Sequence, residues 1–429
     1  MLPASFLMQS RWTQLFYLLT LFTGWVCTTI CFAQDKAPNY DEAKIPAYHL
    51  PELIDAATAA AKDFPTAWRD RRAQLLQTFA EQMYGTFPTT SYTAEYEELE
   101  RGPSCDGKAL RQQWRVTLAT EHGRLPIALV VFTPAEAIAP VPCFLGLNFG
   151  GNHTVAADPQ VLLTQTWVRK KDGLTDGNLA IEAARGSAST RWPIEQIVDA
   201  GMGVATAYYG DIDPDMDDQF QNGIHALFPD HRATAEHPER WGSIAAWAWG
   251  LSRLLDALES QDMHVDARRV SVVGHSRLGK TSLWAGANDE RFMAVISNDS
   301  GCGGAALSRR AVGETVAQIN HSFPHWFCPK FHHYNSKEGD LPIDQHQLLA
   351  LVAPRLLYVA SAAEDRWADP HGEFLSLYLA NEVFTKLPAT KSERSAQANL
   401  KRIGYHLRDG QHDITAWDWA HYIGFVGQQ

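Results

Sequence analysis

A serine stands in a short glycine-flanked stretch that suits nucleophilic chemistry. Gly274-His275-Ser276-Arg277-Leu278-Gly279 follows a valine-rich, strand-like run and precedes a helix-like segment. The pattern is close to the nucleophile elbow Gly-x-Ser-x-Gly, with the second glycine delayed by one residue. In that elbow a tight strand-to-helix turn holds the serine hydroxyl at the end of the sheet, where the helix start favours developing negative charge. We predict that Ser276 is a nucleophile; a structural serine in an ordinary turn is the alternative.

A nucleophilic serine needs a histidine as base and a carboxylate that orients it. In α/β-hydrolases these follow in the order serine, acid, histidine. Among seventeen histidines, His412 stands out because it lies in a loop after the last predicted strand. Glu364 and Asp365 follow the strand predicted over 355–361, and Asp299 follows the strand before it. Each carboxylate could instead cap a helix, so the residues alone leave the acid open.

The elements that must position these groups alternate between strands and helices from about residue 110 onward. Strands rich in Val, Ile and Leu with helices between them are typical of a mainly parallel sheet covered on both faces. We therefore predict the α/β fold class, as a single catalytic domain over 34–429 in which 34–100 braces the main body. We predict strands at 111–118, 126–132, 143–148, 203–208, 269–273, 294–297, 355–361 and 403–407, and helices at 67–84, 193–200, 241–258 and directly after Ser276.

The N-terminus has the features of an export signal. Arg11 is the only charge before Asp35, and the apolar stretch over 15–33 ends in small residues before Gln34. We predict that 1–33 is a cleaved signal peptide and that the protein is exported, to the periplasm or out of the cell. An uncleaved membrane anchor is the alternative, because the stretch is nearly long enough to span a bilayer.

Composition limits the possible partners. The formal charge of −12 argues against nucleic acid as a partner, because a phosphate backbone requires a basic face. With 45% apolar and 20% charged residues the chain has a globular balance. No other segment is apolar enough to cross a membrane, and nothing marks an interface, so we expect a monomer.

Four cysteines remain after the predicted signal: Cys105, Cys143, Cys302 and Cys328. In an exported protein they could pair, and Cys302 with Cys328 is the first pairing to expect because both flank the predicted site. Four free buried thiols are an equal alternative. No cysteine or histidine spacing indicates a metal site.

Taken together, these motifs resemble the glucuronoyl esterases, carbohydrate esterase family 15. The resemblance covers most of the chain from about residue 140 and includes features of the bacterial branch. It rests on Gly274-His275-Ser276-Arg277-Leu278-Gly279-Lys280, Asn298-Asp299-Ser300-Gly301-Cys302-Gly303-Gly304-Ala305, Trp367-Ala368-Asp369-Pro370, His412, Arg191-Trp192-Pro193 and Tyr208-Tyr209-Gly210-Asp211.

The resemblance implies an α/β-hydrolase fold and cleavage of the ester between 4-O-methyl-glucuronic acid on xylan and alcohols of lignin, without cofactor or metal. Ser276 would attack the carbonyl carbon and His412 would take its proton. Arg277 would stabilise the oxyanion through its backbone N–H and its guanidinium. One such donor is worth roughly 3 kcal/mol or more.

The resemblance also implies sugar-binding residues. Lys280 lies four residues after the serine, so one helical turn puts both on the same face, and in the family this lysine binds sugar hydroxyls. Glu314 and Trp367 match further sugar-contacting positions. The alternatives are helix-surface charges for Lys280, Arg277 and Glu314, and a core position for Trp367.

The chain departs from the family pattern at the acid. Fungal members carry Glu where this chain has Asp299, and some bacterial members rely on an acid after the later strand, which matches Asp365. We favour Asp365 as the orienting acid, supported by Asp299. Two other functions remain: an acetyl-xylan or other carbohydrate deacetylase, which needs a small acyl slot, and a non-catalytic carbohydrate-binding protein that kept the fold.

Overall fold

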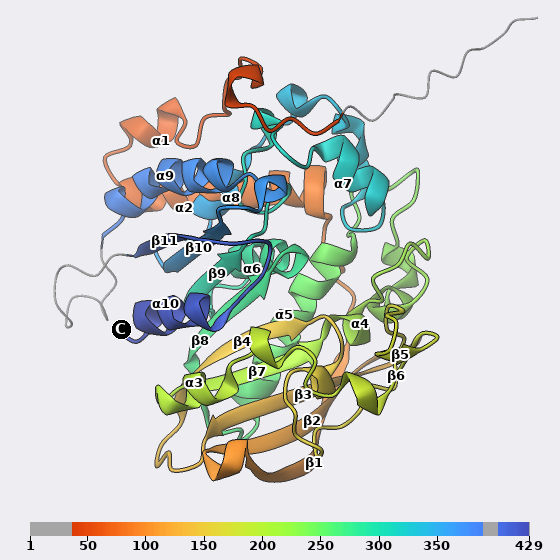
Figure 1. The fold of residues 1–429 in the computed structure, drawn as a ribbon. Helices are drawn as coiled ribbons and strands as arrows, with labels where there is room; N and C mark the ends of the chain where they lie inside the picture. The colour runs from red at the N-terminus through yellow and green to blue at the C-terminus, as the bar shows by residue number, and fades with distance from the viewer. Residues whose placement is uncertain (1–36, 389–401, 429) are drawn as a thin grey trace, which may run out of the picture. The chain divides into compact units, whose positions relative to one another are not determined.

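A twisted sheet forms the centre of the computed structural model, which describes residues 37–388 and 402–428. Among these residues nine strands form one sheet in the order β1-β2-β3-β7-β4-β8-β9-β10-β11 (Figure 1). The six strands from β7 to β11 in this order pair in parallel, and β1, β2 and β3 add an antiparallel edge. The strands are β1 Thr93–Ser104, β2 Ala109–Thr120, β3 Gly123–Pro134, β4 Val141–Asn148, β7 Gly203–Tyr208, β8 Val265–His275, β9 Ala294–Asn298, β10 Leu356–Ala362 and β11 Ile403–Arg408.

Helices cover both faces of this sheet (Figure 1). A separate small hairpin joins β5 (Thr175–Asp176) to β6 (Leu179–Ala180). The helices are α1 Ala56–Ala60, α2 Phe64–Phe79, α3 Ile194–Asp199, α4 Tyr209–Ile212, α5 Ser243–Ser260, α6 Arg277–Asn288, α7 Val316–Ser322, α8 Gln345–Ala350, α9 Pro370–Lys386 and α10 Ala416–Val426.

Alternating side chains of the strands build two cores. Val272 of β8 belongs to the cluster that contains α2, α5, α6, α8 and α9, whereas its neighbour Val273 belongs to the cluster with α3 and α10. Val295 and Ile296 of β9 divide in the same way. Successive strand residues point to opposite faces, so a strand buried on both faces reads as a continuous apolar run. This arrangement confirms the predicted α/β fold class.

The described residues from Pro38 onward belong to one compact unit. The predicted signal at 1–33 lies outside the described residues. Among the described residues, no helix combines the length and the apolarity that crossing a bilayer requires.

The cysteines correct one expectation. Cys105, Cys143, Cys302 and Cys328 are all free, so the expected Cys302–Cys328 disulfide is wrong. Both thiols are buried in the same apolar core as the helices around them. Burial raises the pKa of Cys328 to about 12, which keeps this thiol protonated and unreactive.

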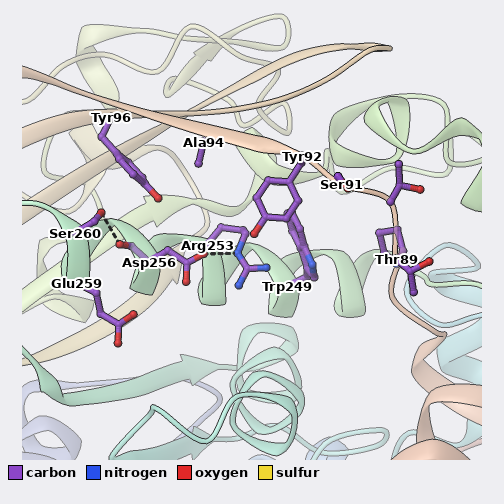
Figure 2. Close-up of a pocket in the computed structure, with 12 residues that line it drawn as sticks. Thr89, Ser91, Tyr92, Ala94, Tyr96, Trp249, Arg253, Asp256, Glu259 and Ser260 are labelled. Carbon is purple, nitrogen blue, oxygen red and sulfur yellow. Dashed lines mark hydrogen bonds and ion pairs between the residues drawn. The ribbon is translucent and has the colours of Figure 1, made fainter.

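An open cavity of about 730 Å³ lies between the start of β1 and the last turns of α5. Figure 2 shows Arg253 lying against Tyr92 and Trp249, with the guanidinium carbon 5.5 and 4.7 Å from the ring centres. Arg253 also donates to Asp256 at 2.7 Å. The cavity contains none of the predicted site residues, so the predicted chemistry lies elsewhere.

Candidate active site

The turn at Ser276 has the geometry of a nucleophile elbow. β8 ends at His275 and α6 begins at Arg277, so Ser276 alone makes the turn, with φ 59° and ψ −127°. Such a backbone conformation is strained for a non-glycine residue and persists only where its surroundings hold it. Here the N–H of Ser276 donates to the carbonyl of Asn298 at 2.9 Å.

Gly274, two residues before Ser276, is required because no side chain fits at this position. A Cβ atom on Gly274 would lie 1.9 Å from the carbonyl oxygen of Leu278, inside the first turn of α6. The helix can therefore fold back over the end of β8 only if residue 274 has no side chain. This explains the first glycine of the motif.

The base and its acid meet at the same edge of the sheet. β10 and β11 are parallel neighbours, so Asp365 and His412, which follow them, come together beyond their carboxyl ends. Nδ1 of His412 donates to Oδ2 of Asp365 at 2.6 Å. The ring centre of His412 lies 4.5 Å from the ring centre of His275, the residue before Ser276. Because Nδ1 is bonded, Nε2 is the nitrogen free to serve the serine.

Asp299 lies beside this pair without bonding to the histidine ring. One carboxylate oxygen each of Asp299 and Asp365 and one ring nitrogen of His412 lie within 4.8 Å of one another. Oδ2 of Asp299 accepts the backbone N–H of Asp413 at 3.3 Å, while its Oδ1 is buried without a partner among the described residues. Both predicted acids thus lie beside the histidine, but only Asp365 forms a hydrogen bond with it. Glu364, the third carboxylate considered, is exposed.

Asp299 is in an environment that favours its neutral form. Burial raises the pKa of Asp299 to about 9, with further increases from the charges of Glu373 and Asp365 and a decrease from Arg408. A carboxyl group that is neutral at pH 7 gives an imidazolium little electrostatic support. Asp299 is therefore poorly suited to support the imidazolium.

A buried glutamate on α9 was missed by sequence reasoning. Oε1 of Glu373 accepts the backbone N–H groups of Ser300 and Gly301 at 2.8 and 2.9 Å, and Oε2 accepts the hydroxyl of Ser361 at 2.6 Å. Burial raises the pKa of Glu373 to about 7, against the hydrogen bond from Ser361. Glu373 thereby ties the turn that follows Asp299 to strand β10.

The pH dependence of stability tests the state of Asp299. Its folded pKa of about 9 exceeds the unfolded value of about 3.9. Between these values the folded protein binds more protons than the unfolded chain, so the free energy of unfolding falls as pH rises. Asp299→Asn removes this contribution. We expect Tm of the variant minus Tm of the wild type to increase by at least about 3 °C between pH 5 and pH 9 in thermal unfolding. A Tm difference that is constant over this range would contradict the protonated state.

The guanidinium of Arg277, predicted to stabilise the oxyanion, is bound at one end. Its Nη1 forms an ion pair with the buried carboxylate of Asp215. The guanidinium carbon lies 4.5 and 5.3 Å from the ring centres of Trp326 and Phe323, two rings that stack on each other. One-fifth of the side chain stays exposed. Arg277 is thus positioned beside Ser276 by a carboxylate that was not among the predicted site residues.

Lys280 is buried one helical turn beyond the serine, which is not the helix-surface position considered as its alternative. Its Nζ donates to the carbonyl of Ser300 at 2.5 Å and lies 5.9 Å from the ring centre of Trp326. Burial lowers the pKa of Lys280, while the nearby charge of Glu314 raises it. A buried cation is retained only where oxygen atoms surround it.

Glu314 and Trp367 come together as neighbours. The backbone N–H of Glu314 donates to the carbonyl of Trp367 at 3.0 Å. Burial raises the pKa of Glu314, against the charge of Lys280 and a hydrogen bond from the Trp367 side chain. The Trp367 side chain is 41% exposed, so it is not a core residue. The structure therefore gathers an exposed indole, a carboxylate and a buried lysine.

Comparisons with known proteins agree with this architecture. A family model described as fungal glucuronyl esterase matches residues 197–388. The chain is 46% identical over 420 residues to the carbohydrate esterase MZ0003 from an unknown prokaryotic organism, across 96% of each protein.

Solved structures give the same result. A promiscuous CE15 esterase from a marine bacterial metagenome superimposes with a TM-score of 0.81 at 46% identity, covering 91% of this chain and 100% of the other. A glucuronoyl esterase from Solibacter usitatus gives a TM-score of 0.80 at 40% identity, covering 90% and 99%.

The sheet order and the turn at Ser276 define the fold as an α/β-hydrolase. Because the identity to a carbohydrate esterase extends over nearly the whole length of both proteins, the chain belongs to carbohydrate esterase family 15. The protein is a carbohydrate esterase, as the motifs predicted.

Proposed function

We propose that the protein hydrolyses 4-O-methyl-glucuronoyl esters that join xylan to alcohols of lignin. The observation that carries this proposal is the polar surrounding of the elbow: Lys280, one turn from Ser276, is buried with Glu314 as its charged neighbour. Apart from its reacting carbonyl, an acetyl group offers neither residue a hydrogen-bond partner. A uronic acid offers ring hydroxyls to both. The relatives named as glucuronoyl esterases support the same acyl group.

The proposed mechanism proceeds through an acyl-enzyme. Oγ of Ser276 attacks the ester carbonyl carbon while Nε2 of His412 takes its proton. The tetrahedral oxyanion is stabilised by the backbone N–H and the guanidinium of Arg277. The C–O bond to the alcohol then breaks, and the imidazolium returns its proton to the leaving oxygen. Water repeats the sequence on the acyl-enzyme and releases the glucuronate.

Asp365 has two tasks in this mechanism. Its hydrogen bond to Nδ1 fixes the tautomer of His412 that leaves Nε2 unprotonated, and its charge stabilises the imidazolium that forms. Both tasks require an ionised acid, and the raised pKa of Asp299 makes that residue poorly suited to them.

The substrate also bears on location. A polymer such as glucuronoxylan does not enter a cell, so we propose that residues 1–33 direct export and are removed. Mass measurement of the N-terminus of the protein secreted by its producer tests this: a start near Gln34 is expected, and an intact Met1 would contradict it.

Acyl selectivity tests the proposed function. We expect kcat/KM for benzyl glucuronate to exceed that for p-nitrophenyl acetate by at least about 100-fold, because the polar groups of the site are satisfied only by the sugar. Turnover of the acetate with no turnover of the glucuronate would instead indicate a deacetylase. No Ser276-dependent turnover of either ester would favour a binding protein.

A matched pair of tryptophans refines this test. Trp367 and Trp417 are exposed to similar extents, 41% and 47%, but Trp417 packs against His406 and His421 of the C-terminal region. Trp367→Ala should raise KM for benzyl glucuronate about ten-fold, equivalent to about 1.4 kcal/mol, and leave the acetate reaction unchanged. Trp417→Ala should change neither. Equal effects of both variants would remove the sugar-contact role of Trp367.

A further inference from the structure

We propose that Asp215 is a positioning residue, which holds the guanidinium of Arg277 in the place where the oxyanion forms. The inference rests on the proposed function, because it assigns Arg277 to the oxyanion. Asp215 lies shortly after α4 and only 1% of it is exposed. Neither its sequence context nor the family motifs mark it as functional.

Asp215 accepts hydrogen bonds from segments that are far apart in the chain. Oδ1 accepts Nε2–H of His325 at 2.9 Å and Nε1–H of Trp326 at 2.8 Å. Oδ2 accepts the hydroxyl of Tyr209 at 2.9 Å and Nη2–H of Arg169 at 3.2 Å, in addition to its bond with Arg277. A carboxylate offers about four lone-pair positions, so this one is saturated and cannot rotate without losing bonds.

The surroundings keep this buried carboxylate ionised. Burial by itself raises the pKa of Asp215, but the hydrogen bond from His325, the charge of Arg277 and the hydrogen bond from Trp326 hold it well below its ordinary value. The residue is therefore a fixed negative charge over the working pH range. A fixed charge with fixed donors is a rigid support for a flexible arginine.

Arg277 is held on two sides. Asp215 binds Nη1 at one end of the guanidinium, and the guanidinium carbon lies 4.5 Å from the ring centre of Trp326. Trp326 also donates its indole N–H to Asp215, so one indole fixes the carboxylate and the guanidinium together. Since the guanidinium is a rigid planar fork, fixing one end beside this indole also restricts the direction of the remaining N–H groups.

Charge counting explains why the ion pair does not cancel the effect of Arg277. Asp215 is shared with Arg169, whose side chain is 55% exposed. Two guanidinium groups and one carboxylate leave this group of three with one net positive charge. Asp215 thus orients Arg277 while the site keeps a positive field for a developing oxyanion.

A double-mutant cycle tests the proposal. We measure kcat and KM of the wild type, Asp215→Asn, Arg277→Met and the double variant on benzyl glucuronate and on p-nitrophenyl acetate. Misplacing a catalytic donor by about 1 Å costs about 10²-fold in rate. We therefore expect Asp215→Asn to lower kcat about 100-fold with KM changed less than three-fold. The double variant should be no slower than Arg277→Met within three-fold. Additive losses would overturn the proposal.

The second ester separates this proposal from the proposed function. An oxyanion forms on any ester, so the same non-additivity is expected with the acetate. If the enzyme failed on glucuronate but the cycle on acetate stayed non-additive, only the substrate assignment would fall. A loss confined to glucuronate would instead place Asp215 in sugar binding and overturn its positioning role.

Two further variants control for stability. Asp344 is an equally buried carboxylate, 3.2 Å from Arg309 and outside the site. Asp344→Asn should lower Tm and leave kcat within two-fold. If Asp215→Asn does not fold, Tyr209→Phe removes one hydrogen bond from Asp215 and keeps its charge. It should lower kcat about three- to ten-fold, and this effect should vanish in the Arg277→Met background; unchanged kcat would overturn the proposal.

Discussion

Replacement of Asp365 by asparagine should lower kcat for benzyl glucuronate by about 10³- to 10⁴-fold. The side chain keeps its shape, but an amide can donate its N–H to Nδ1 of His412 and so stabilise the tautomer whose Nε2 carries the proton. That tautomer cannot accept the proton of Ser276. The lost charge also leaves the imidazolium unsupported. The measurement is steady-state kinetics at a pH where the free histidine is neutral.

Asp299→Asn is the matched control, since both acids lie beside the same ring. We expect its kcat to fall less than about ten-fold, because Asp299 makes no hydrogen bond to His412 and is neutral at pH 7. The Tm difference between this variant and the wild type should still increase between pH 5 and pH 9. A large loss in Asp299→Asn with a small loss in Asp365→Asn would reverse the assignment of the two acids.

Much of the fold could be predicted because the central strands are buried on both faces. The run 203–208 matches β7 residue for residue, and β4, β9, β10 and β11 differ from the predicted ranges by one or two residues. β8 begins at Val265, four residues earlier than predicted, because the added residues include Asp266, which is only partly buried, and Arg268, which is exposed. Apolar patterning marks only the part of a strand that helices cover.

The first strand was missed for a related reason. β1 (Thr93–Ser104) is the antiparallel edge of the sheet, and all its residues except Ser104 are exposed or only partly buried, several exposed ones being glutamates. Such a strand is held by backbone hydrogen bonds to β2, and its side chains give little hydrophobic signal. The segment predicted to brace the main body therefore includes part of the sheet itself.

The residues of the candidate site could be predicted only where they directly follow the ends of strands. Ser276, Asp365 and His412 each lie just beyond a parallel strand, so the topology alone brings them together. The sequence could not predict which acid bonds to His412, because this depends on the local backbone conformation, such as the φ of 44° at Asp299. Glu373 and Asp215 act through contacts with segments distant in the sequence, and no local motif predicts such contacts.

Replacement of Ser276 by alanine should have the largest effect of any single substitution. The elbow places this hydroxyl alone at the end of β8, and its two chain neighbours are a buried histidine and the arginine bound to Asp215. Without the serine no acyl-enzyme forms, and only binding and oxyanion stabilisation act on a direct attack by water. We expect kcat to fall by at least about 10⁴-fold.

The most direct measurement is hydrolysis of benzyl glucuronate by the wild type, Ser276→Ala and Ser282→Ala. Ser282 is a buried serine on the same helix, which donates to the carbonyl of Ile296 at 2.7 Å and takes no part in the proposed chemistry. We predict rapid turnover by the wild type, turnover within three-fold of it by Ser282→Ala, and no turnover above background by Ser276→Ala. Wild-type activity that survives in folded Ser276→Ala would contradict the assignment of Ser276 as the nucleophile of a glucuronoyl esterase.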